Sequence, residues 1–247
     1  MSWWVRGATG LTRTAGAIPI LIEAEHYPWP TTRQAGPGWV RQVARPSTAT
    51  PFVGGGCKTC AMSNLTAAST AEAHRILAAR FAALIDGVTD WDVPTPVKEW
   101  TAGDVVDHLA WLPGMLGSMG VTLDVPAEGD RAQRFAAQTT AVQDVLEAPD
   151  ADRVVDTGVM GPMPLSQIIS QFYNFDLFAH GWDLARATGQ DDALDEEVAA
   201  GTLAAMRPNS EMLQASGQFG PPQPVADGAP MGEQLMAFLG RDPNWRP

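Results

Sequence analysis

The sequence predicts an all-α fold: a four-helix bundle followed by a small additional C-terminal segment of helix and loop. Apolar residues recur at helical spacing in four long segments, as expected where one face of each helix packs on a shared core. The chain has 247 residues, 45% of them hydrophobic, which is enough for one such core. No run of eighteen apolar residues is present, so we expect no transmembrane helix and a cytoplasmic protein.

The chain divides into two parts of different composition. Residues 1–61 are rich in Gly, Pro, Thr, Ala and Arg and show neither helical nor strand periodicity. We expect them to be a disordered leader, or translated upstream sequence with the true start at Met62. Residues 62–247 form the predicted helical domain. Both cysteines, Cys57 and Cys60, precede it and lack a second ligand pair, so the domain has no thiol of its own.

Charge is also divided unevenly between the two parts. Residues 1–61 carry six basic and two acidic residues, whereas residues 62–247 carry ten basic and 26 acidic ones. A domain with this excess of acid repels phosphate backbones and anionic lipids. We therefore expect neither nucleic acid nor a membrane as its partner.

The first two helices are expected at about residues 66–86 and from Thr101 onwards. Gly87 follows the first as a C-cap. The second starts with Thr101 and Asp104 spaced nearly as in a capping box, and Pro113 is expected to kink or shorten it. The apolar faces consist of Leu77, Phe81, Leu84 and Val88 in the first helix and Val105, Leu109, Leu112 and Leu116 in the second.

Further helices and one short extended piece follow. The extended piece, Val154 and Val155, precedes a turn rich in Gly and Pro. Gly189 is placed to end the fourth helix. The helices are expected at about residues 129–146, 165–188, 194–206 and 231–239. The first two of these complete the bundle, and the last two make up the additional C-terminal segment.

Three histidines, His74, His108 and His180, lie in the helical domain. His180 is four residues after Asp176 in the fourth predicted helix, so both side chains lie on one face, one turn apart. That face continues an apolar stripe formed by Ile169 and Phe172, which aims a carboxylate and an imidazole at the bundle core. Burying an unpaired carboxylate costs several kcal/mol, so the pair needs a partner, and a divalent metal would serve.

His108 lies in the same way beside the apolar face of the second predicted helix. Together, His108, Asp176 and His180 supply three metal ligands and leave one coordination position open, as catalytic sites require. Two imidazoles and one carboxylate suit zinc, although nickel, iron and manganese are also compatible. The pattern alone also fits hydrogen-bonded core histidines and an ordinary helix pair between Asp176 and His180.

Two other polar residues fall near this constellation. Asp183 is three residues past His180 and is a candidate to accept a hydrogen bond from the imidazole and orient it. It would equally serve as a surface or capping residue. His74 falls on the apolar face of the first helix, so we expect it in the core or in a pocket wall rather than among the ligands.

Three segments resemble the signatures of one known family. Residues 94–109 (PTPVKEWTAGDVVDHL) are similar to its first signature and residues 176–189 (DLFAHGWDLARATG) to its second, and the tail at residues 219–243 is also similar. On these motifs the chain resembles the mycothiol-dependent maleylpyruvate isomerase branch of the DinB-like metal-binding superfamily. The resemblance runs from about Leu65 to Pro247 and excludes residues 1–61.

The resemblance implies a DinB-like bundle with His108, Asp176 and His180 as ligands of a divalent metal, and with the small thiol mycothiol as co-substrate. A metal-stabilised thiolate would add to an activated double bond and leave again, giving cis–trans isomerisation. Alternatively it would attack a small electrophile and stay, giving S-transfer. The characterised isomerases carry glutamate where Asp176 stands, so the metal is expected closer to the fourth helix here.

Three hypotheses remain open on the sequence. The first is a metal- and thiol-dependent isomerase or transferase, which an open coordination position beside a pocket would favour. The second is a non-catalytic metal-binding module, such as a sensor or sequestering protein, which a closed four-ligand site would favour. The third is a bundle whose polar core has lost its metal, in which case the ligand side chains would point apart.

Overall fold

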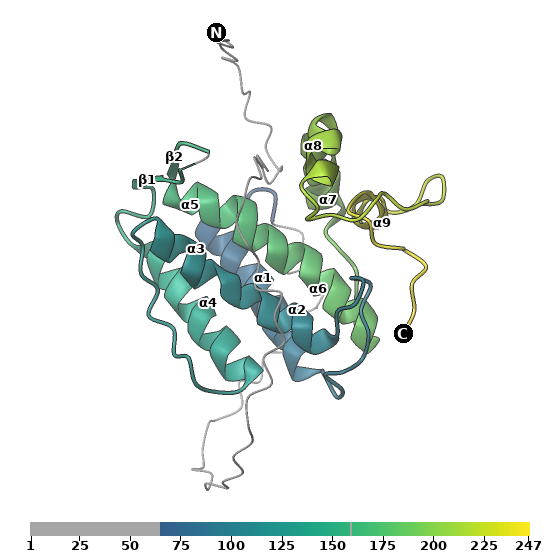
Figure 1. The fold of residues 1–247 in the computed structure, drawn as a ribbon, viewed down its shortest axis with the longest axis horizontal. Coiled ribbons are helices and arrows are strands. Elements are labelled where there is room, and N and C mark those ends of the chain that lie inside the picture. Colours follow the sequence, from purple (N-terminus) through teal and green to yellow (C-terminus); the bar gives the residue numbers. More distant parts are fainter. Residues whose placement is uncertain (1–64, 159) are drawn as a thin grey trace, which may run out of the picture.

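Four helical segments lie side by side in the computed structural model, which describes residues 65–158 and 160–247 (Figure 1). This confirms the all-α fold class and the four-helix bundle. The segments are α1 (Thr70–Asp86); α2 (Ala102–His108) and α3 (Leu112–Ser118), joined by the 3-10 turn Leu109–Trp111; α4 (Arg131–Glu147); and α5 (Leu165–Ile168) and α6 (Phe175–Thr188), joined by the π-helical turn Ile169–Asn174.

Two smaller units complete the described part of the chain. The extended piece expected after the third helix is an antiparallel hairpin of β1 (Val154–Asp156) and β2 (Pro162–Pro164), with Val155 opposite Met163. Residues 190–247, here called the C-terminal segment, lie to one side of the bundle (Figure 1). Their helices are α7 (Glu196–Met206), the 3-10 turn Arg207–Asn209, α8 (Ser210–Ala215) and α9 (Met231–Phe238). The six-residue α8 was not predicted, because so short a run shows no period.

Local hydrogen bonds set where the helices begin. The first helix starts at Thr70 rather than near residue 66, because the Ser69 hydroxyl accepts the backbone N–H of Glu72 and caps it there. At the second helix the predicted capping box is confirmed: Thr101 accepts the Asp104 N–H, and the Asp104 carboxylate accepts the Thr101 N–H.

The two helical segments that carry the candidate ligands are both interrupted. The second breaks at His108 into a 3-10 turn, and Pro113 then stands in the first turn of α3, where proline is tolerated. The fourth was expected to be continuous, but the π turn separates α5 from α6. Its extra residue per turn changes the helical phase between Phe172 and Asp176, so the predicted stripe does not run straight through.

Two glycines at helix ends behave differently. Gly189 adopts the left-handed conformation (φ 68°) and ends α6 as predicted. Gly87 is the C-cap of α1, as predicted, but it keeps a right-handed conformation (φ −87°). A Cβ at Gly87 would lie 2.2 Å from Oε1 of Gln190, so a larger residue there would displace that side chain, which donates to the Leu84 carbonyl.

The predicted apolar faces form the core. All predicted core residues of the second helix are buried, as are Phe135, Val142 and Leu146 of α4. In α1 the predicted Leu77, Phe81 and Leu84 are buried, whereas Val88 follows the end of α1 and packs partly buried against the core. Within the described residues, no helix is long and apolar enough to cross a membrane. The expectations for residues 1–61 and for a start at Met62 lie outside the described residues and stay predictions.

Candidate metal centre

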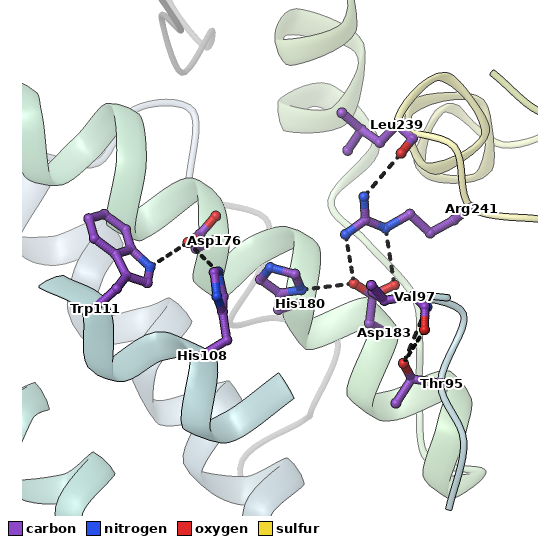
Figure 2. A network of polar contacts seen from close by, with 9 residues as sticks. All are labelled: Thr95, Val97, His108, Trp111, Asp176, His180, Asp183, Leu239 and Arg241. Atoms are coloured by element: carbon purple, nitrogen blue, oxygen red, sulfur yellow. Dashed lines mark hydrogen bonds and ion pairs between the residues drawn. The ribbon is translucent and has the colours of Figure 1, made fainter. Parts of the chain in front are cut away.

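The bundle brings His108, Asp176 and His180 together. His108 ends α2, whereas Asp176 and His180 lie one turn apart on the neighbouring helix α6 (Figure 2). Each offers one ligand atom, and these atoms all lie within 4.8 Å of one another. Among the described residues, this is the group of histidine and carboxylate side chains that is close enough to hold a metal ion. Side chains that converge in this way do not favour the third hypothesis, a bundle that has lost its metal and whose ligand side chains point apart.

The carboxylate of Asp176 is held from the opposite helix by two side chains. Its Oδ2 lies 3.3 Å from Nε2 of His108 and accepts a hydrogen bond of 2.8 Å from the indole N–H of Trp111. Residues three apart in a 3-10 turn lie directly above one another. The turn after α2 therefore stacks His108 and Trp111 so that both face the same oxygen (Figure 2).

These contacts keep Asp176 ionised. Burial is the largest single influence and raises the pKa of this carboxyl. The hydrogen bond with His108, the electrostatic interactions with His180 and His108, and the Trp111 N–H together outweigh burial and hold the pKa below its ordinary value. A carboxylate that stays ionised is the form that binds a divalent cation.

On the side away from Asp176, His180 contacts a buried ion pair formed by Asp183 and Arg241. Its Nδ1 lies 2.9 Å from Oδ2 of Asp183, which is fully buried. Asp183 in turn pairs with Arg241 from the tail of the C-terminal segment: Nη2 donates to Oδ2 at 3.1 Å and Nε donates to Oδ1 at 3.3 Å. Figure 2 shows this row of side chains running away from Asp176.

The Asp183 contact selects the tautomer of His180. Burial is the strongest influence on the pKa of Asp183 and raises it, but the Arg241 charge and the His180 contacts outweigh burial and lower the pKa. An ionised carboxylate only accepts, so Nδ1 of His180 carries the proton and donates it to Asp183. In the neutral ring this tautomer has its lone pair on Nε2, the atom through which His180 would bind a metal. The hydrogen bond expected between Asp183 and His180 is thus present in the structure.

An aromatic side chain lines the same group. The indole of Trp100 stacks on the His180 ring at 5.6 Å between centroids and tilts against the His108 ring at 4.9 Å. The candidate ligands remain partly exposed, at 15% for the His108 side chain, 18% for Asp176 and 8% for His180. Two cavities, of about 230 and 110 Å³, lie elsewhere and are lined by other residues. His108 and Asp176 are thus the more exposed of the three candidate ligands.

His74 is a core residue, as expected. It is fully buried, and its Nδ1 lies 2.7 Å from Oε1 of Gln143 on α4. Burial lowers its pKa, so the ring is neutral near pH 7. It is not a member of the group formed by His108, Asp176 and His180.

Sequence reasoning missed three residues around the site: two of them contact candidate ligands, and the third contacts Asp183. Trp100 stood in a quoted motif but was given no role. Trp111 follows His108 by three residues, a signal that becomes useful once a helical turn is assumed at that point. Arg241 lies 58 residues from Asp183 and had no local signal.

Comparisons with known proteins show the family of the chain. Residues 73–185 match a protein family described as the mycothiol maleylpyruvate isomerase N-terminal domain. Two uncharacterised proteins of Mycobacterium tuberculosis, MT0763 of strain CDC 1551 / Oshkosh and Rv0738 of strain H37Rv, are each 32% identical to the chain over 180 residues, covering 68% of this chain and 96% of theirs. The chain belongs to the mycothiol maleylpyruvate isomerase N-terminal domain family. No solved structure matches it significantly.

The family match covers the bundle but not the whole described chain. The matched residues, 73–185, include all three candidate ligands together with Trp100, Trp111 and Asp183. It ends before the C-terminal segment and therefore before Arg241. Arg241, the residue that pairs with Asp183, thus lies outside the residues that match the family.

Proposed function

We propose that this protein binds a zinc ion through His108, Asp176 and His180 and uses it to activate a small external thiol, mycothiol, for isomerisation of a small electrophile or for S-transfer to one. The observation that carries the proposal is the convergence of these three side chains. The family membership supports it as well. The acidic excess of the helical domain argues against nucleic acid or a membrane as the partner.

The donor set fits zinc in type and in spacing. Two ligand atoms bound tetrahedrally at about 2.0 Å lie about 3.3 Å apart. Nε2 of His108 and Oδ2 of Asp176 already have this separation, 3.3 Å. The largest separation in the group, up to 4.8 Å, would close by small side-chain rotations. Because aspartate is short, this fit requires α2 and α6 to lie close together, as they do.

The thiol must come from outside the helical domain, because residues 62–247 contain no cysteine. Zinc at an open coordination position lowers the pKa of a bound thiol, so that thiolate is available at neutral pH. The chain itself supplies the orientation: Asp183 holds His180, and Trp111 with His108 holds Asp176. Trp100 stacks on one face of the His180 ring.

The reaction of the thiolate decides between the two activities. In isomerisation the sulfur electron pair forms a bond to an electron-poor alkene carbon, and the alkene pair moves onto the conjugated carbonyl. Rotation about the resulting single bond follows, and expulsion of the thiolate restores the double bond with no net change in composition. In S-transfer the new carbon–sulfur bond remains and the electrophile loses a leaving group, or gains a proton where it has none.

One observation favours a second candidate, a non-catalytic metal-binding module that senses or sequesters the ion. The candidate ligands are at most 18% exposed, and Trp100 covers two of them. Such a site would bind metal tightly but admit a bulky thiol poorly. The two candidates differ in whether added thiol reaches the bound metal.

The experiment is a competitive zinc titration followed by a thiol-consumption screen. The chain is used with Cys57 and Cys60 replaced by serine, so that neither zinc nor an electrophile can react with its own thiols. We expect one zinc per chain, and consumption or turnover of mycothiol with some small electrophiles only when zinc is bound. Binding without any thiol chemistry would favour the module, and no stoichiometric binding would contradict both candidates.

A further inference from the structure

Arg241 is held in place by the backbone that carries it. The N–H groups of Gly240 and Arg241 bond to the carbonyls of Ala237 and Met236, which is the Schellman arrangement that ends a helix, here α9. Gly240 takes the required left-handed conformation, φ 87°. A Cβ on it would lie 2.5 Å from Cα of Gly220, so only glycine fits. The end of α9 therefore fixes the backbone position from which the Arg241 side chain extends.

All three nitrogens of the Arg241 guanidinium donate hydrogen bonds to other groups of the protein. It donates from Nε and Nη2 to the two oxygens of Asp183 and from Nη1 to the carbonyl of Leu239 at 3.0 Å. Arg241 is 8% exposed and Asp183 is fully buried. Two parallel donors set the plane of a carboxylate as well as its position. Arg241 thereby directs Oδ2 of Asp183 at Nδ1 of His180 (Figure 2).

We propose that Arg241 is a positioning residue for the metal centre: it aligns Asp183, which sets the tautomer and orientation of His180, so that docking of the α9 end and metal affinity are coupled. This inference rests on the proposed zinc site. The coupling is reciprocal, because any docking that strengthens zinc binding must itself be strengthened by zinc to the same extent.

Positioning and simple electrostatics predict opposite signs. Arg241→Met removes a positive charge near a cation site, so electrostatic repulsion alone predicts tighter zinc binding. Loss of alignment predicts weaker binding, because partners of a ligating histidine change metal affinity by about 10–100-fold when mutated. We expect Arg241→Met to weaken zinc binding by about 10-fold in a competitive titration of the full chain with both cysteines replaced by serine.

Arg186 supplies a matched control. It also reaches from α6 to the tail, donating to the carbonyl of Pro243 at 2.9 Å, and it pairs with Asp192 and stacks on Trp182. Arg186→Met therefore removes one charge and one tail contact but leaves Asp183 aligned. We expect its zinc affinity to stay within about twofold of the parent chain. Equal weakening in both variants would overturn the proposal in favour of general tail docking.

A double-mutant cycle tests whether Arg241 acts through Asp183. Arg241→Met is compared in the parent chain and in the Asp183→Asn background, where no buried carboxylate needs an arginine. If Arg241 works by aligning Asp183, its replacement weakens zinc binding in the parent and has no further effect in Asp183→Asn. The same loss in both backgrounds would overturn the proposal. The double variant contains neither buried charge, which protects its fold if a single variant is unstable.

Hydrogen exchange gives a readout independent of activity. Zinc should slow amide exchange in residues 231–243 of the parent chain and of Arg186→Met, and much less in Arg241→Met. Zinc affinity that is unchanged or higher in Arg241→Met, or equal protection of the tail in all variants, would overturn the inference and leave the zinc site standing. Failure of the parent chain to bind zinc would overturn both.

Discussion

Two aspartates seven residues apart on α6 serve the candidate metal centre in different ways. Asp176 is partly exposed and faces two imidazoles and the indole N–H of Trp111. Asp183 is fully buried, binds a full positive charge and reaches the site only through His180. The first is arranged to bind a cation that the chain does not supply. The second is already neutralised by Arg241. Metal affinity and fold stability should therefore respond differently to the same change, Asp to Asn, at the two positions.

The largest effect on metal affinity is expected for Asp176→Asn. An amide oxygen is a poorer ligand than a carboxylate, so zinc affinity should fall by more than the roughly 100-fold upper range seen when an outer partner is lost. The metal-free stability should change by about 1 kcal/mol or less, since the amide oxygen still accepts from Trp111. Zinc titration and thermal unfolding measure the two quantities.

Asp107→Asn is the control for that variant. Asp107 lies next to His108 on α2, but its carboxylate is 41% exposed and pairs with Arg131 and Arg134. Its replacement should leave zinc affinity unchanged. Equal affinities in Asp176→Asn and in the parent chain would show that Asp176 is not a ligand.

Asp183→Asn should lower zinc affinity less than Asp176→Asn does, but lower the stability of the metal-free protein more. Zinc affinity should fall by about 10–100-fold through His180. The metal-free protein should lose about 3–5 kcal/mol, because Arg241 is left buried without its counter-ion. Denaturant unfolding of the zinc-free protein measures the loss. If Asp183→Asn proved no less stable than Asp176→Asn, the contrast between the two carboxylates would be wrong.

A smaller effect is expected at the hydrogen bond that holds Asp176. Trp111→Phe keeps an aromatic ring and removes the N–H that donates to Oδ2. A hydrogen bond to a charged group contributes about 1.5–3 kcal/mol. Because the bond forms with and without metal, only part of this contribution is lost from zinc binding, and zinc affinity should fall by no more than roughly tenfold. Trp100→Phe is the comparison, because Trp100 contacts both imidazoles through ring contacts. A larger loss for Trp100→Phe would move the supporting role from Trp111 to Trp100.

The smallest effect concerns pH in the absence of metal. Both aspartates have a lowered pKa in the fold, so each contributes stability that is fully present above the unfolded pKa of about 3.9. The contribution is lost as the pH falls through the folded pKa. We expect thermal midpoints to drop below about pH 4, and to drop less steeply in Asp176→Asn and Asp183→Asn. Parallel profiles in all three proteins would contradict this assignment.

The sequence predicted those parts of the site that depend on local periodicity. The four bundle segments and the Asp176–His180 pair follow from helical spacing, and His108 followed from its place beside an apolar face. The π turn was missed because residues 169–174 read as ordinary helix. The role of Trp111 depends on a 3-10 turn, and that of Arg241 on the docking of a distant tail. The spacing of Trp111 from His108 is informative only once that turn is known, and Arg241 leaves no local pattern at all.

The central claim is that the three side chains hold one metal ion with a position open to an external thiol. Cobalt(II) titrated into the chain with both cysteines replaced by serine tests it most directly, because sulfur bound to cobalt gives a charge-transfer band that histidine and carboxylate ligands do not. We predict one cobalt per chain with the strong visible absorption of a four-coordinate site, and a new charge-transfer band when mycothiol is added. Cobalt absorption that is insensitive to Asp176→Asn, or no charge-transfer band at saturating thiol, would contradict the account.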